Sequence, residues 1–137
     1  MKKYIVLIAF ICTSILYGQE NPIQIVFDVT TADEATHQAT IRHVTLMSEA
    51  YPESEFEVVL YSQSINMVLA EKSSVSEEIE KLVANDNVSF KVCAGTMKRN
   101  KVTEADLVKG VESVPDGIVE IVSKQKAGWG YIKEARN

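Results

Sequence analysis

The chain has 137 residues, of which 14 are basic and 19 acidic, and its net charge at pH 7 is −5 with neutral histidines. This length suits one domain with a single hydrophobic core. The negative charge argues against nucleic acid or an anionic lipid surface as the partner, because both are bound by positively charged surfaces.

Residues 1–18 have the pattern of an export signal. Lys2 and Lys3 precede an uncharged apolar stretch, and the small residue Gly18 follows it. The stretch is shorter than the roughly 20 residues of a membrane-spanning helix. We therefore predict a signal peptide over residues 1–18 and one mature domain over residues 19–137, located in the periplasm or secreted and not embedded in a membrane.

The first part of the mature chain predicts a strand, a helix and a second strand. Residues 23–29 are almost continuously apolar, as expected for a strand that is covered on both faces. Residues 31–34 have the form of a helix capping box, and Pro52 ends the helix that follows. Residues 55–61 then predict the second strand.

We expect one stripe of the helix between these strands to face the sheet. Its small and apolar members recur at about 100° per residue: Ala32, Ala35, Ala39, Leu46, Met47 and Ala50. Ile41 and Val44 fall outside this stripe and indicate either a subunit contact or incidental apolar surface. His37 and His43 are about 240° apart around the helix, so they cannot bind one metal ion from one face, and His43 is interpreted as a core or interface residue. No metal site is predicted.

The remaining chain continues the alternation. A helical turn over 64–70, an amphipathic helix over 75–83, a third strand over 88–93 and helical segments over 96–100 and 103–106 are followed by a short fourth strand over 111–114. Pro115–Gly117 opens a last helix, and Gly128 ends it before a fifth strand over 129–132. One face of this helix holds Ile118, Ile121, Val122 and Gln125. The pattern predicts a three-layer α/β/α sandwich with a mainly parallel sheet of about five strands.

In such a sheet, ligands bind beyond the carboxyl ends of the strands. The residues at these ends are 28–31, 61–64, 93–96 and 114–117. Among them, Asp28, Tyr61, Ser62 and Thr96 are the predicted ligand-binding residues. Asp28 either orients a ligand or accepts hydrogen bonds from backbone N–H groups.

Cys93 is the only cysteine of the predicted mature domain, because Cys12 lies in the export signal. It is therefore free, paired between chains, or reactive. It ends a predicted strand and precedes a helix start with Lys98 and Arg99, and helix N-termini and cations both lower the pKa of a thiol. The alternative is a small apolar side chain packed in the core.

Residues 92–99 (Val-Cys-Ala-Gly-Thr-Met-Lys-Arg) and 102–107 resemble the cysteine segment of the DsrE/DsrF-like family. Three other segments are similar to the small exported members, so that the resemblance covers nearly the whole mature chain: residues 25–28, 117–122 and 128–132. The resemblance implies a compact α/β/α sandwich that commonly forms homo-oligomers. It also implies that Cys93 matches the cysteine that carries a persulfide between partner proteins in the sulfur-relay members.

The chain departs from the relay members in three ways. It has a predicted export signal, whereas relay members work in the cytoplasm with partner subunits. Thr96 and Met97 stand where some relatives have a second cysteine, and residues 61–64 replace a His-Gly type of turn.

Two functional hypotheses follow. The first is a cysteine-dependent sulfur or thiol-redox carrier that needs no cofactor, exchanges sulfur with a donor or acceptor protein through Cys93, and is not an ordinary turnover enzyme. The second is a non-catalytic, oligomeric binding protein of the periplasm in which Cys93 is only packed.

Overall fold

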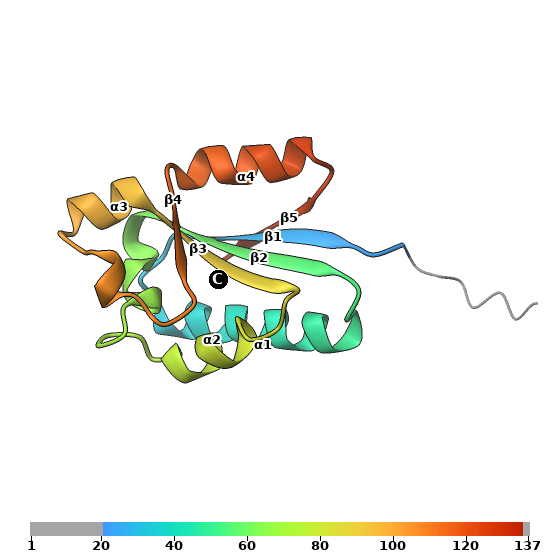
Figure 1. The fold of residues 1–137 in the computed structure, drawn as a ribbon, viewed down its shortest axis with the longest axis horizontal. Coiled ribbons are helices and arrows are strands. Elements are labelled where there is room, and N and C mark those ends of the chain that lie inside the picture. The colour runs from blue at the N-terminus through green and yellow to red at the C-terminus, as the bar shows by residue number, and fades with distance from the viewer. Residues whose placement is uncertain (1–20, 136–137) are drawn as a thin grey trace, which may run out of the picture.

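The computed structural model describes residues 21–135, and the predicted signal peptide lies outside them. Five strands form one parallel sheet in the order β4-β3-β2-β1-β5 (Figure 1). The strands are β1 (Gln24–Val29), β2 (Glu55–Leu60), β3 (Val88–Cys93), β4 (Glu112–Val114) and β5 (Gly130–Glu134). All five lie within one or two residues of the predicted segments, and the sheet is parallel throughout.

Helices cover both faces of the sheet, which confirms the predicted three-layer sandwich (Figure 1). The α-helices are α1 (Glu34–Ala50), α2 (Ser76–Leu82), α3 (Ala94–Arg99) and α4 (Gly117–Lys126), and two 3-10 helices are η1 (Ser62–Val68) and η2 (Glu104–Asp106). Helices α1 and α2 lie on one face and α4 lies on the other (Figure 1). No helix within residues 21–135 is long and apolar enough to cross a membrane.

The strand order makes α4 cross the whole sheet. The chain places β2, β3 and β4 successively on one side of β1, and then returns through α4 to add β5 on the other side. Helix α4 consequently contacts β1, β2, β3 and β5. Its first residue lies near the carboxyl ends of the strands, which is where parallel α/β proteins bind their ligands.

The two faces of the sheet differ in character. The large core lies between the sheet and the α1/α2 layer, and its largest buried side chains include Phe27, Phe56 and Phe90. The core beneath α4 is small: Val26, Val59 and Ile121 are buried, with Tyr61 and Trp129 packed against them. Strand residues that alternate with those of the large core therefore place polar groups under α4.

The buried face of α1 is not the predicted alanine stripe. Its buried residues are Thr36, His37, Thr40, Ile41, Val44 and Ser48. Ile41 and Val44 are core residues, whereas Leu46 is 64% exposed. Polar side chains can occupy this face because they are hydrogen-bonded within the helix: the Thr40 hydroxyl donates to the Thr36 carbonyl at 2.9 Å. The pattern of apolar residues alone therefore predicts the wrong buried face for α1.

The start of α1 and its histidines also differ from expectation. Asp33 is the N-cap, in place of the predicted box over residues 31–34, and its Oδ2 accepts from the Thr36 N–H at 2.8 Å. His37 is buried, with Nε2 at 2.8 Å from the Thr31 carbonyl oxygen. His43 is not a core residue, because its side chain is 53% exposed and contacts Glu134 at 2.9 Å.

Candidate functional site

Cys93 is the last residue of β3 and directly precedes α3, at the carboxyl edge of the sheet. It is a free, half-buried thiol. Val88, Phe90 and Val92 turn into the main core, so the alternation of the strand directs Cys93 toward the α4 face. The side chain thus belongs to the edge where the sequence predicted ligand-binding residues.

The N-terminus of α4 packs directly on Cys93. A Cβ atom built on Gly117 would stand 3.3 Å from the Cys93 Cβ and 3.4 Å from the Tyr61 Cβ, which is closer than ordinary van der Waals contact. The absence of a side chain at residue 117 lets the helix start approach both strand ends. Asp116 caps this helix start by accepting the N–H groups of Ile118 and Val119, which leaves the Gly117 N–H for the cysteine.

Hydrogen-bond donors surround the sulfur. Burial raises the pKa of Cys93, but the backbone N–H groups of Gly117, Thr96 and Gly95, together with the Thr96 hydroxyl, outweigh it and lower the pKa below the ordinary value. The sequence suggested that Lys98 and Arg99 lower the pKa of Cys93, but neutral hydrogen-bond donors lower it instead. The arrangement stabilises a thiolate, the nucleophilic form of cysteine.

Thr96 connects the cysteine to the turn after β2. It is fully buried, and its hydroxyl oxygen accepts from the Ser62 N–H at 3.1 Å and from Arg99 Nη2 at 3.4 Å. Since a hydroxyl has one proton and two acceptor positions, its proton remains for Cys93. Ser62 has a φ of 62°, a left-handed conformation that is costly for a residue with a side chain and is enriched at functional sites.

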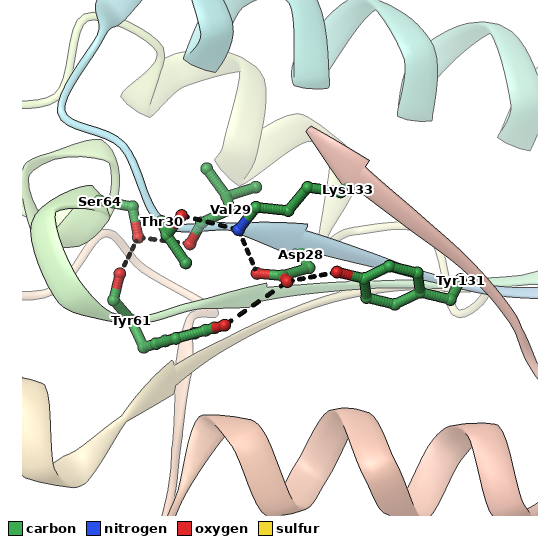
Figure 2. A network of polar contacts seen from close by, with 7 residues as sticks. All are labelled: Asp28, Val29, Thr30, Tyr61, Ser64, Tyr131 and Lys133. Atoms are coloured by element: carbon green, nitrogen blue, oxygen red, sulfur yellow. Dashed lines mark hydrogen bonds and ion pairs between the residues drawn. The ribbon is translucent and has the colours of Figure 1, made fainter. Parts of the chain in front are cut away.

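A second polar cluster is centred on Asp28, which is 4% exposed (Figure 2). Its Oδ2 accepts from the Tyr131 hydroxyl at 2.7 Å and from the Tyr61 hydroxyl at 3.5 Å, and its Oδ1 contacts Lys133 Nζ at 3.0 Å. Lys133 also donates to the Thr30 hydroxyl at 2.7 Å. The cluster connects β5 to β1, and through Tyr61 it is linked to Gly117, which packs on Cys93.

The carboxylate affects both tyrosines. The hydrogen bond to Asp28, followed by burial and the Asp28 charge, raises the pKa of Tyr131 to about 12. Burial and then the Asp28 charge raise the pKa of Tyr61 above its ordinary value. Both phenols therefore stay protonated as hydrogen-bond donors at neutral pH.

Three of the other predicted site residues lie in the surroundings of Cys93: Thr96 donates to its sulfur, the Ser62 N–H donates to the Thr96 hydroxyl, and Tyr61 packs against Gly117. Asp28 is joined to them through the Tyr61 hydroxyl. An open hollow of about 450 Å³ lies beside the Ser62 turn and is lined by Ser62, Gln63, Ile65, Asn66, Arg99 and Asn100.

Tyr131 and Lys133 were missed by the sequence analysis. Alternation along the last strand places them on one face, but only the pairing of β5 with β1 brings them to Asp28. Within residues 21–135, no three histidine, cysteine or acidic side chains gather as a metal site.

Fold and site together define a small three-layer α/β protein with a cysteine thiolate stabilised at the carboxyl edge of its sheet. The model of the DsrE/DsrF-like family matches residues 24–133, and the chain belongs to that family. A comparison with curated proteins found no match.

Solved structures with the same fold include proteins from three organisms. MTH1491, a protein of unknown function from Methanobacterium thermoautotrophicum, is 29% identical with a TM-score of 0.75, covering 81% of this chain and 98% of that one. The ychN protein from E. coli is 16% identical with a TM-score of 0.66, over 82% and 97% of the two chains. BT1422, a conserved protein of unknown function from Bacteroides thetaiotaomicron, is 16% identical with a TM-score of 0.66, over 80% and 93%.

Proposed function

We propose that this protein carries sulfur as a persulfide on Cys93. The observation that supports the proposal best is the set of donors around the sulfur, from Gly117, Thr96 and Gly95, which lower the pKa of the thiol. Such donors stabilise the thiolate that must attack the donor persulfide. Membership of the DsrE/DsrF-like family supports the same role.

The transfer needs no cofactor and no external oxidant. The Cys93 thiolate attacks the outer sulfur of a donor persulfide, a new S–S bond forms on Cys93, the S–S bond of the donor breaks, and the donor leaves as a thiolate. An acceptor thiolate then attacks the outer sulfur on Cys93 in the same way and regenerates the Cys93 thiolate. The two steps conserve atoms and electrons, and the protein acts as a carrier between a donor protein and an acceptor protein.

We further propose that the carrier is exported, with residues 1–18 removed as a signal peptide. The basic start and the short apolar stretch of the sequence support this location. Export places the thiol in an oxidising compartment, where a persulfide is less secure than in the cytoplasm. The close packing of the start of α4 on Cys93 would shield one side of it there.

An alternative function is that of a non-catalytic oligomeric binding protein, and the surface offers a contact for such an oligomer. Helix α4 exposes Ile118 (58%), Val119 (60%) and Val122 (42%). These three residues, called here the α4 apolar patch, suit a contact between copies of the chain. A homo-oligomer formed through this patch is compatible with either function.

Alkylation and sulfur loading of the mature protein test the carrier proposal. The rate of alkylation by iodoacetamide, followed across pH, should give a thiol pKa below that of the urea-unfolded protein. Incubation with a low-molecular-weight persulfide should add the mass of one sulfur atom per chain, and a dithiol should remove it. The Cys93→Ser variant is the control and should gain no sulfur. A thiol that titrates as in the unfolded chain and accepts no sulfur would leave the binding-protein alternative.

A further inference from the structure

A carboxylate is buried beneath α4, away from the cysteine. Glu57 lies in β2, is 2% exposed, and points to the α4 face of the sheet like Val59 and Tyr61. Its Oε2 contacts Lys124 Nζ at 2.9 Å and accepts from the Ser89 hydroxyl at 3.3 Å. Its Oε1 is buried and has no hydrogen-bond partner in the described part of the chain. Burying a carboxylate that has one oxygen without a hydrogen bond costs free energy. The burial of Glu57 therefore needs a structural or functional reason.

The partner lysine is held from several sides. Lys124 lies in the last turn of α4, its Nζ stands 4.2 Å from the centroid of the Trp129 ring, and Glu120 is 3.8 Å away on the same helix. Only 25% of the Lys124 side chain is exposed. The ion pair thus joins the end of α4 to β2 within a mostly buried setting.

Helix α4 and strand β2 are in contact at both ends. Seven residues separate Gly117 from Lys124, a rise of about 10 Å along the helix, and four residues separate Tyr61 from Glu57, about 13 Å along the strand. Gly117 packs on Tyr61, and Lys124 pairs with Glu57. The helix therefore runs antiparallel to the strand, with Ile121 buried between the two contacts.

We propose that Glu57 and Lys124 are positioning residues for Cys93: their ion pair fixes the C-terminal half of α4 on β2 and so keeps the Gly117 N–H on the cysteine sulfur. The inference rests on the proposed function, because it assigns the pair to the thiolate that this function needs. A buried ion pair adds little net stability compared with apolar residues, but its geometry can select one arrangement of the elements that it joins.

The effect of the pair on the sulfur is indirect. Glu57 is level with Ser89 in the sheet, and Cys93 follows Ser89 by four residues, about 13 Å along β3. At that distance the opposite charges of Glu57 and Lys124, which are in contact with each other, largely cancel in their effect on the sulfur. The charged groups that face Glu57 are Lys124 and Glu120 from α4. On the cysteine side, Tyr61 directly follows β2, and Lys91 of β3 is paired with Glu112.

Two single variants separate positioning from a direct effect of charge. Removing the negative charge with Glu57→Gln would lower the pKa of Cys93 if charge acted directly, whereas removing the positive charge with Lys124→Met would raise it. Loss of positioning raises the pKa in both variants, because the Gly117 N–H moves off the sulfur in both. Lys124→Arg keeps the pair and should restore the wild-type value, and Lys126→Met is the matched control on the exposed side of α4.

The measurement is the pH dependence of Cys93 alkylation in the full chain, with hydrogen exchange of the Gly117 amide as the second readout. We expect about three- to tenfold slower alkylation below the thiol pKa in Glu57→Gln and Lys124→Met, and faster exchange of Gly117. If Lys124→Met does not fold, Glu57→Gln, which preserves the shape of the side chain, decides alone. An unchanged or lowered pKa in Glu57→Gln overturns the inference but leaves the proposed function standing. A wild-type thiol with the pKa of the unfolded chain contradicts the proposed function itself.

Discussion

Gly117 and Cys93 are in contact across the sheet edge, with the first N–H of α4 directed to the thiol of β3. The two residues are 24 positions apart in the sequence, and they meet because α4 begins at the carboxyl edge of the sheet. This contact combines a helix start with the last residue of a strand. The pKa of the Cys93 thiol therefore depends on the position of α4 relative to the sheet.

A methyl group at residue 117 should disturb that contact. We expect Gly117→Ala to raise the pKa of Cys93, because the new Cβ would stand 3.3 Å from the Cys93 Cβ and would push the helix start away. The pH profile of alkylation measures the shift. Gly130→Ala is the control, since its Cβ would lie at an ordinary 3.6 Å from the Gln24 carbonyl oxygen, away from the cysteine. Equal pKa values in the two variants would refute the role of close packing.

Removal of the Thr96 hydroxyl should affect both acidity and stability. Thr96→Val takes a donor from Cys93 and an acceptor from the Ser62 N–H. We expect a higher thiol pKa and a loss of about 0.5–1.5 kcal/mol in the free energy of unfolding, because the Ser62 N–H loses its hydrogen-bond partner. Thr96→Ser keeps the hydroxyl and should retain the low pKa. Urea unfolding and alkylation at several pH values provide the two measurements.

Stability at alkaline pH should depend on Tyr131. A tyrosine in the unfolded chain ionises near pH 10.0, whereas the Asp28 hydrogen bond and burial raise the pKa of Tyr131 to about 12 in the folded chain. Between these values the unfolded chain has lost a proton that the folded chain keeps. The contribution is therefore complete below pH 10 and is lost as the pH rises toward 12.

Tyr131→Phe removes this contribution. We expect the variant to be about 1–3 kcal/mol less stable at neutral pH, because the buried Asp28 carboxylate loses its shortest hydrogen bond. Its stability should also fall less steeply than that of the wild type from pH 10 upward. Tyr51→Phe, at an exposed tyrosine outside the cluster, should change neither quantity. Denaturant unfolding at a series of pH values makes the comparison.

The free energy of unfolding can test which face of α1 is buried. Val44 is fully buried and Leu46 is 64% exposed, although the sequence pattern assigned them the opposite way. Val44→Ala should cost about 1–3 kcal/mol, and Leu46→Ala should change the free energy of unfolding by less than about 0.5 kcal/mol. A larger loss for Leu46→Ala would restore the alanine stripe as the buried face, or place Leu46 in a contact between chains.

The α4 apolar patch predicts the oligomeric state. If copies of the chain associate through it, Val119→Glu should shift the protein to a monomer in light scattering at micromolar concentration, because a carboxylate would be buried in the contact. Glu77→Gln, which changes an exposed residue of α2, is a control that should leave the molecular mass in light scattering unchanged. A wild-type monomer, or an oligomer indifferent to Val119→Glu, would exclude this patch as the contact.

Local patterns in the sequence were sufficient to predict the strands and the fold. Apolar β-branched runs mark strands such as β1 and β3, and their alternation with helices requires parallel crossovers and a layered sandwich. The same patterns placed Cys93 at a strand end, beside a helix start. They failed on α1, because its buried face contains Thr36, Thr40 and Ser48, whose hydroxyls find partners that an apolar pattern does not register.

What surrounds Cys93 was decided in part by tertiary structure. The sequence suggested that the helix start after Cys93, together with Lys98 and Arg99, acidifies the thiol; the donors are Thr96 and Gly95 of that helix start and Gly117 of α4. Two of them follow the cysteine directly, whereas Gly117 arrives only because the order β4-β3-β2-β1-β5 sends α4 back across the sheet. Strand order depends on long-range pairing, which local periodicity does not encode. The sequence by itself determined that one cysteine ends a strand beside a helix start; the crossing of α4 added Gly117 to the groups that stabilise its thiolate.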